Sequence, residues 1–194
     1  MSDYKKVRED IGNRLGLDNT DNFDVFTDKV AEIESTSGKN TVSTISSARG
    51  IFQFLTKGKG NAFQTGLNRL ERHLGDDTEW IDEARKHNDP NKLTEDQQRA
   101  LFLANVYQQK GSDPFFLKIA QGNKQAMAEA YSKFHHTVED IHNDPRIFRI
   151  FELSPPAPTE MDIKVGEQKP TEDEIIERAK TAGTFPEAMQ DRLV

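Results

Sequence analysis

The segment with the clearest chemical potential spans residues 32–55, where a predicted helix ends in acids and a polar loop of small residues follows. Two carboxylates compete for a catalytic role there, Glu32 and Glu34. Glu34 lies four residues after Val30 and continues the apolar stripe of its helix, whereas Glu32 follows Asp28 on the polar side. A carboxyl group at the end of a buried stripe is partly desolvated, which raises its pKa toward the value that a general acid needs. Spacing therefore makes Glu34 a candidate catalytic acid, and it leaves open the commoner alternative of an acid that merely turns outward at a fraying helix end.

The elements that must position this carboxylate are predicted to be helices. The helix that ends near Glu34 begins at a cap provided by Thr20 or Asn22 and carries apolar residues at helical spacing. Further helical patterns follow it, and the strongest of them has a capping box. These patterns cover residues 62–74, 78–86, 94–109 (capped by Thr94 and Gln97), 115–120 and 124–134, with a short element at 138–142. We expect a mostly α fold with a loop or small hairpin, at the β-branched residues 41–45, inserted after the catalytic helix.

Proline usage predicts where the chain divides. Six of the eight prolines lie in the last 50 residues, and residues 152–169 have the composition of an extended linker. Residues 171–180 then predict a short helix capped by Thr171, which is too short to be stable alone and so is expected to dock on a partner. We expect an N-terminal arm at residues 1–20, a helical domain at 21–144, and an extended C-terminal tail at 145–194.

Composition excludes several classes of protein. The net charge of −7 argues against a nucleic-acid partner, and the absence of cysteine excludes disulfides, thiolate nucleophiles and cysteine-ligated metals. The chain has no apolar run long enough for a transmembrane segment, and its first residues lack the apolar segment of a secretory signal. His135 and His136 are adjacent without an HExxH pattern, and neighbouring residues on a helix point in different directions. We therefore expect neither a metal site nor a cofactor.

Two motifs of the chain resemble those of a known enzyme family. Glu34-Ser35, a loop containing Ser43, and residues 47–53 (SARGIFQ) resemble the first motif of the soluble lytic transglycosylases, the goose-type branch of the lysozyme-like superfamily. In that family the motif is Glu-Ser, a loop with Ser, and Gly-Ala-x-Gly-(Leu)-Met-Gln. Here serine replaces the first glycine, Ile-Phe replaces Leu-Met, and the loop is one residue longer. Residues 126–131 (AMAEAY) resemble the helix with the family's Ala-Tyr-Asn-Ala-Gly motif, although Ser-Lys-Phe replaces Asn-Ala-Gly.

The resemblance covers residues 22–140 and implies a lysozyme-like helical domain that cleaves peptidoglycan glycan strands. In this family one glutamate, matched by Glu34, is the only acid and base. It protonates the bridging oxygen of the β-1,4 bond between N-acetylmuramic acid and N-acetylglucosamine, and then takes the proton of the C6 hydroxyl that closes a 1,6-anhydro ring. Polar neutral groups are expected around it. The substrate-binding candidates are Ser35, Ser43, Gly50 (whose missing Cβ would allow close approach of the sugar), Phe52, Gln53, Tyr131 and His136.

A lytic transglycosylase without a secretory signal fits a bacteriophage better than a bacterium. We expect an enzyme that is made in the host cytoplasm, carried in the virion and used at the cell wall, with the C-terminal tail binding other tail or ejection proteins of the particle. Two alternatives stay open. One is a hydrolytic muramidase of the same fold, and the other is a structural virion protein that keeps the fold without activity.

Overall fold

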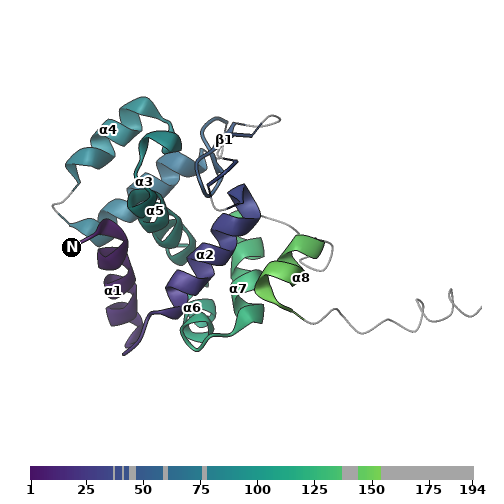
Figure 1. Cartoon of the computed structure of the whole chain (residues 1–194). Helices are drawn as coiled ribbons and strands as arrows, with labels where there is room; N and C mark the ends of the chain where they lie inside the picture. The colour runs from purple at the N-terminus through teal and green to yellow at the C-terminus, as the bar shows by residue number, and fades with distance from the viewer. Residues whose placement is uncertain are drawn as a thin grey trace, which may run out of the picture. The chain divides into compact units, whose positions relative to one another are not determined.

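Eight α-helices and one pair of short strands make up the part of the chain that this computed structural model describes, residues 1–36, 38–40, 42–43, 47–58, 61–75, 78–136 and 144–153. The prediction of a mostly α protein is therefore confirmed (Figure 1). The elements are α1 Asp3–Leu15, α2 Asn22–Ser35, β1 Ala48–Arg49, β2 Phe54–Leu55, α3 Ala62–Leu74, α4 Glu79–His87, the 3-10 turn η1 Pro90–Lys92, α5 Glu95–Tyr107, α6 Asp113–Ala120, α7 Lys124–Tyr131, the π-helical turn η2 Ser132–His136, and α8 Pro145–Phe151. None of these helices is long and apolar enough to cross a membrane.

The expected helices agree with the observed ones to within two residues, with two exceptions. The α-helix expected over 124–134 changes to a π-helical turn after Tyr131. Asp21, rather than Thr20 or Asn22, precedes α2, and its side chain makes no capping hydrogen bond. The capping box at the start of α5 is present as predicted, since the Thr94 side chain accepts from the Gln97 backbone and the Gln97 side chain accepts from the Thr94 backbone.

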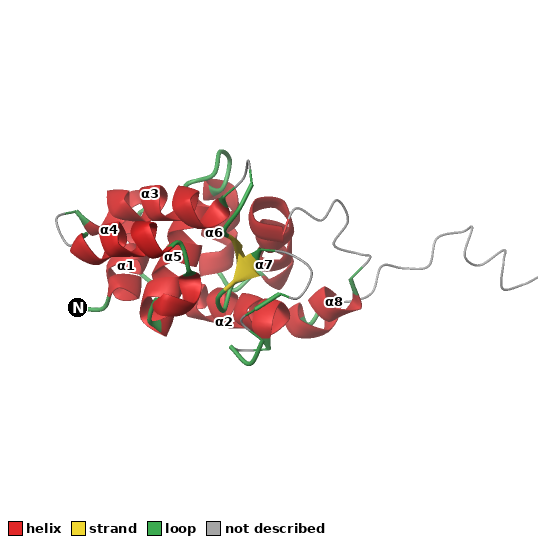
Figure 2. Ribbon diagram, turned by 90° about the horizontal axis from the view of Figure 1, so that it is seen from above, coloured by secondary structure: helices red, strands yellow, loops and turns green. Residues whose placement is uncertain are grey.

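The central element is α5, which packs against α1, α2 and α3 (Figure 1). Its residues from Ala100 to Ala104 are completely buried, so this helix is surrounded by other elements on every side. Figure 2, seen from above, shows α3 and α4 toward one end of the molecule and α7 and α8 toward the other. The end of α2 lies near the second group, and this places Glu34 at an edge of the core.

Residues 1–20 are not a separate arm, because α1 is part of the core. Val7 and Ile11 are completely buried, and the Tyr4 hydroxyl is hydrogen-bonded to the Thr27 hydroxyl of α2 at 2.7 Å. Tyr4, Val7, Ile11 and Leu15 recur at helical spacing, and this face of α1 packs on the core. The domain expected at 21–144 therefore begins at the first helix.

The C-terminal boundary of the helical domain also differs from the expected residue 144. Ile147 and Phe151 of α8 are completely buried in the same core, and Lys29 of α2 forms an ion pair with Glu152 at 3.1 Å. Met1–Pro155 forms one compact unit. The predicted element at 138–142, most of the linker, and the predicted helix at 171–180 lie outside the described residues.

The strand pair lies later in the chain than predicted. Ala48 pairs with Leu55 and Arg49 pairs with Phe54, while the expected strand at 41–45 supplies only an isolated bridge from Val42 to Arg49 among its described residues. Burial explains this position, because Phe52 and Phe54 at the turn and in β2 are completely buried. The Phe52 ring stacks on Phe102 of α5, with centroids 4.5 Å apart and planes 9° from parallel. The hairpin is therefore fixed by core packing rather than by β propensity.

Replacing Ile11 by Ala tests whether α1 belongs to the core. We expect the free energy of unfolding to fall by about 2–5 kcal/mol, because the substitution leaves a cavity among completely buried side chains. Urea denaturation measures this loss. Lys5→Ala, on the exposed face of the same helix, is the matched control and is expected to change stability by about 0.5 kcal/mol or less. Equal, small effects of both substitutions would contradict the assignment of α1 to the core.

Candidate active site

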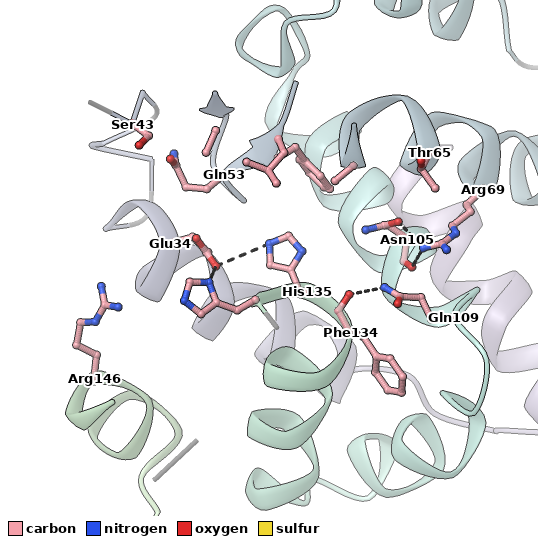
Figure 3. A pocket seen from close by; sticks show the side chains of 15 residues that line it. Glu34, Ser43, Gln53, Thr65, Arg69, Asn105, Gln109, Phe134, His135 and Arg146 are labelled. Carbon is pink, nitrogen blue, oxygen red and sulfur yellow. Dashed lines mark hydrogen bonds and ion pairs between the residues drawn. The ribbon is translucent and has the colours of Figure 1, made fainter. Parts of the chain in front are cut away.

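A cleft with a volume of about 700 Å³ opens at the C-terminal end of α2. Figure 3 shows the side chains that line it, which come from elements far apart in the sequence. Glu34 comes from the end of α2, Gln53 from the hairpin, Arg69 from α3, Asn105 from α5, and His135 from the π-helical turn η2. The cleft therefore lies where the hairpin and the turn after α7 meet the end of α2.

Glu34 is held by three side chains on the far side of the cleft. Its side chain is only 9% exposed, and the Tyr131 hydroxyl donates a hydrogen bond of 2.8 Å to its Oε1. The same oxygen lies 3.4 Å from Nδ1 of His136 and 3.8 Å from Nε2 of His135. The Tyr131 hydroxyl and both imidazoles therefore approach the same carboxylate oxygen of Glu34.

The π-helical turn explains how two adjacent histidines reach one carboxylate. In a π-helix the repeat joins residues i and i+5, so His136 lies above Tyr131, and the two rings stack with centroids 5.4 Å apart and planes 12° from parallel. An ordinary α-helix would have placed an earlier residue there. The expectation that His135 and His136 point in different directions therefore fails at this turn, because both rings approach Glu34.

The partners of Glu34 reverse the expected direction of its pKa shift. Burial is the largest influence and raises the pKa, but the hydrogen bond from His136, the field of His135 and the Tyr131 hydroxyl together lower it below its ordinary value. The expectation of a raised pKa was therefore wrong, because partners distant in sequence stabilise the carboxylate. The hydrogen bond with Glu34 raises the pKa of His136, while burial lowers that of His135. Both shifts act in the direction of a Glu34 carboxylate paired with a protonated His136.

The predicted substrate-binding residues fall into two groups. Ser43, Gln53 and His136 line the cleft, and Tyr131 is completely buried beneath Glu34. Ser35 is also buried and does not reach the cleft. Its hydroxyl donates to the Ala31 carbonyl and accepts from the Gly38 amide, and these two bonds complete the end of α2.

Gly50 and Phe52 have structural positions rather than places on the cleft wall. A Cβ on Gly50 would lie 2.6 Å from Oε1 of Gln98 and 2.7 Å from Cβ of Pro90, and the backbone of Gly50 has φ of +81°. The close approach that this glycine permits is therefore to α5 and η1 instead of to a sugar. Phe52 is completely buried against Phe102, in agreement with the expectation that phenylalanines form the core.

Several cleft residues could not be identified from the sequence. Arg69 donates to the backbone and side-chain oxygens of Asn105 at 2.9 and 2.7 Å, and no described carboxylate pairs with it. Gln109 reaches the backbone of Phe134, and Arg146 lies at the opposite side of Glu34 (Figure 3). No sequence pattern separates Arg69 or Arg146 from the rest of the 26 lysines and arginines of the chain. The sequence shows His135 only as the residue next to His136, and no pattern places it beside Glu34.

Comparison with protein families, with curated proteins and with solved structures finds no match to this chain. The chemistry of the site therefore follows from its own geometry. A buried carboxylate joined to a phenol and an imidazole, at the wall of a cleft of this size, can exchange a proton with a bound ligand. No group of three His, Asp or Glu side chains within the described ranges has the arrangement of a metal site.

Replacing Gly50 by Ala tests the role of this glycine in fixing the hairpin. We expect a loss of about 2–4 kcal/mol in the free energy of unfolding, because the new methyl group overlaps Gln98 and Pro90 in addition to straining a positive φ. Gly58→Ala is the control, since Gly58 has a positive φ of +92° but no atoms within 4 Å of its Cβ position. Its expected loss is about 1 kcal/mol. Chemical denaturation that gives equal losses for the two variants would refute the packing role.

Proposed function

We propose that the protein is a peptidoglycan lytic transglycosylase with a lysozyme-like helical domain and Glu34 as its acid and base. The observation that carries this proposal is the hydrogen bond between Tyr131 and Glu34. These residues are 97 positions apart, and they are the two that match the family's first and second motifs. A chance resemblance of two short segments gives no reason for their functional side chains to meet.

The acidic residues that line the cleft are consistent with a mechanism that uses a single carboxylate. Glu34 is the only Asp or Glu among the described residues that line the cleft. Most glycosidases need two carboxyl groups on opposite sides of the scissile bond, one acting as acid and the other as nucleophile or base. A transglycosylase does not, because the C6 hydroxyl of the substrate replaces water and its proton returns to the same glutamate.

The proposed reaction follows from this arrangement. Protonated Glu34 donates to the bridging oxygen while the bond from C1 of N-acetylmuramic acid to that oxygen breaks and an oxocarbenium-like centre develops. The Glu34 carboxylate then accepts the proton of the C6 hydroxyl. The C6 oxygen bonds to C1 at the same time and closes the 1,6-anhydro ring. Water is neither consumed nor released. The Tyr131 hydroxyl holds the carboxylate in place during both transfers.

Other lining groups suit a peptidoglycan strand. Ser43, Gln53 and Asn105 are neutral hydrogen-bonding residues of the kind that hold sugar hydroxyls and N-acetyl groups. Arg69 adds a positive charge without a carboxylate partner among the described residues. Peptidoglycan offers carboxylates for such a group in the stem peptides attached to N-acetylmuramic acid.

The proposal includes a bacteriophage particle as the location of the enzyme and the host cell wall as its place of action. The supporting observation is the composition of the tail beyond the helical domain, which is rich in proline and charged residues and suits docking to other virion proteins. A hydrolytic muramidase is the second candidate. It is favoured by His136, which is 39% exposed beside Glu34 and could orient a water molecule.

Glu34→Gln is the substitution that tests the catalytic assignment. We expect it to reduce the release of soluble fragments from purified sacculi by at least about 100-fold, because a carboxamide cannot transfer the proton. Turbidity loss or a zymogram measures this activity. Glu32→Gln, two residues away on the exposed side of the helix, is expected to stay within about twofold of wild type. A wild-type protein that leaves sacculi intact would favour the structural virion protein instead.

The mass of the released products separates the two reaction types. We expect 1,6-anhydro muropeptides, which are lighter than hydrolysed ones by one water molecule, about 18 Da. Mass spectrometry of fragments from unreduced sacculi gives this difference directly. Fragments with only reducing ends would identify a muramidase and refute the transglycosylase reaction.

A further inference from the structure

The proposed mechanism uses Glu34 alone, although two imidazoles lie within 4 Å of its Oε1. The mechanism also requires a protonated Glu34 at its first step, whereas the surroundings of Glu34 favour its carboxylate. A source for that first proton is therefore needed inside the site. The two histidines differ in their contacts, and the difference identifies the source.

His135 is fixed by the core and is not the proton source. Its side chain is only 8% exposed, and its Nε2 donates to the Phe52 carbonyl at 2.8 Å, so that nitrogen is already committed. Its ring also packs edge-on against Phe54 and Phe102. These contacts favour a neutral imidazole that joins the π-helical turn to the hairpin.

His136 has the contacts expected of a proton carrier. Its Nδ1 faces Glu34 Oε1 at 3.4 Å, its ring is held flat against Tyr131, and its side chain is 39% exposed at the cleft. The carboxylate and the imidazole therefore share one contact at the wall of the cleft. The stacking and the hydrogen bond fix the ring without removing it from solvent.

We propose that Glu34 and His136 form a dyad that holds one proton, which lies on His136 in the empty cleft and on Glu34 when a glycan strand fills it. Only the transfer of the proton to Glu34 on glycan binding rests on the proposed function. The sharing of one proton by Glu34 and His136 does not depend on a substrate. In the transfer, one N–H bond at His136 breaks and one O–H bond at the Glu34 carboxyl forms. No proton is exchanged with solvent, and no co-reactant is needed.

Exclusion of water drives the transfer. A sugar that fills the cleft removes the solvent that stabilises the Glu34 carboxylate and the His136 imidazolium, and an ion pair of this kind becomes costly in a low-dielectric site. The neutral pair, with Glu34 protonated, is then favoured. Glu34 can donate this proton to the bridging oxygen and recover one from the C6 hydroxyl, so neutral His136 is not consumed.

The charged groups that face His136 come from three elements. Glu34 of α2 raises the pKa of His136, while Tyr131 and His135 on its own helical segment contribute a hydroxyl and a neutral imidazole. Across the cleft, Asp144 and Arg146 at the start of α8 pair with each other at 2.7 Å and act on His136 in opposite directions. The carboxylate of Glu34 is therefore the group that determines the charge of His136.

The shared proton is measured by NMR titration of the histidine imidazoles, with the His136 signal assigned by its loss in His136→Gln. In the wild-type protein we expect the midpoint of His136 to lie above its ordinary value of 6.5. In Glu34→Gln it is expected to fall to that value or lower, because the carboxylate that favours the protonated imidazole is gone. An unchanged His136 midpoint in Glu34→Gln overturns the dyad.

The catalytic half of the proposal is tested by the pH dependence of kcat/KM on soluble peptidoglycan fragments. In His136→Gln, Glu34 holds its proton alone, so the alkaline limb moves to lower pH and activity at pH 7 falls about tenfold for each pH unit of the shift. Activity is expected to recover toward pH 5, with KM within about twofold of wild type. His87→Gln is the matched control and keeps the wild-type profile.

The outcomes separate this proposal from the proposed function. A His136→Gln enzyme with the wild-type alkaline limb overturns the proton-carrier role, even if its activity is lower at every pH. A wild-type protein without activity on sacculi or fragments overturns the transglycosylase proposal, and the NMR titration still decides whether the dyad holds a proton.

Discussion

The burial of the Glu34 carboxylate is the constraint on which the rest of the site depends. A buried carboxylate without partners is strongly unfavourable, and it costs several kcal/mol unless hydrogen bonds and opposite charge compensate for the lost water. Here the compensation comes from Tyr131 and His136, which lie far along the chain from Glu34. The distance between the end of α2 and the turn after α7 must therefore be closely fixed. Packing of α2 and α7 against α8 maintains that distance.

The hairpin also helps to fix the turn after α7 beside Glu34. Phe52 stacks on α5 with its ring, and its carbonyl accepts the hydrogen bond of His135, so one residue connects the core, the hairpin and the π-helical turn. Gly50 permits this because Gln98 of α5 occupies the space of a Cβ and accepts from the Ile51 amide at 2.7 Å. A small strand pair thereby becomes a rigid wall of the cleft, which two isolated strands could not form.

The helices and the position of Glu34 follow from local sequence information, whereas the electrostatics of the site does not. The capping box of Thr94 and Gln97 and the apolar stripe ending near Glu34 depend on residues within one or two turns, which a pattern can identify. The pKa of Glu34 depends on Tyr131 and His136, which only folding brings near. The π-helical turn likewise depends on tertiary contacts, because nothing in the residues Ser132–His136 opposes an α-helix. The division at residue 20 was wrong even on local information, since Tyr4, Val7, Ile11 and Leu15 have the helical spacing of a core-facing helix.

The partners that make burial possible also set a problem for acid catalysis. Hydrogen bonds that stabilise a carboxylate oppose its protonation, so a glutamate well enough held to be buried is a poor acid in the resting state. A second carboxylic acid would supply a proton but would also repel the Glu34 charge, and none lines the described cleft. An imidazole avoids this conflict, because its protonated form stabilises the carboxylate and its neutral form leaves the glutamate protonated. The stack of His136 on Tyr131 keeps both forms in the same position, and this is why a π-helical turn, rather than an ordinary helix end, suits this site.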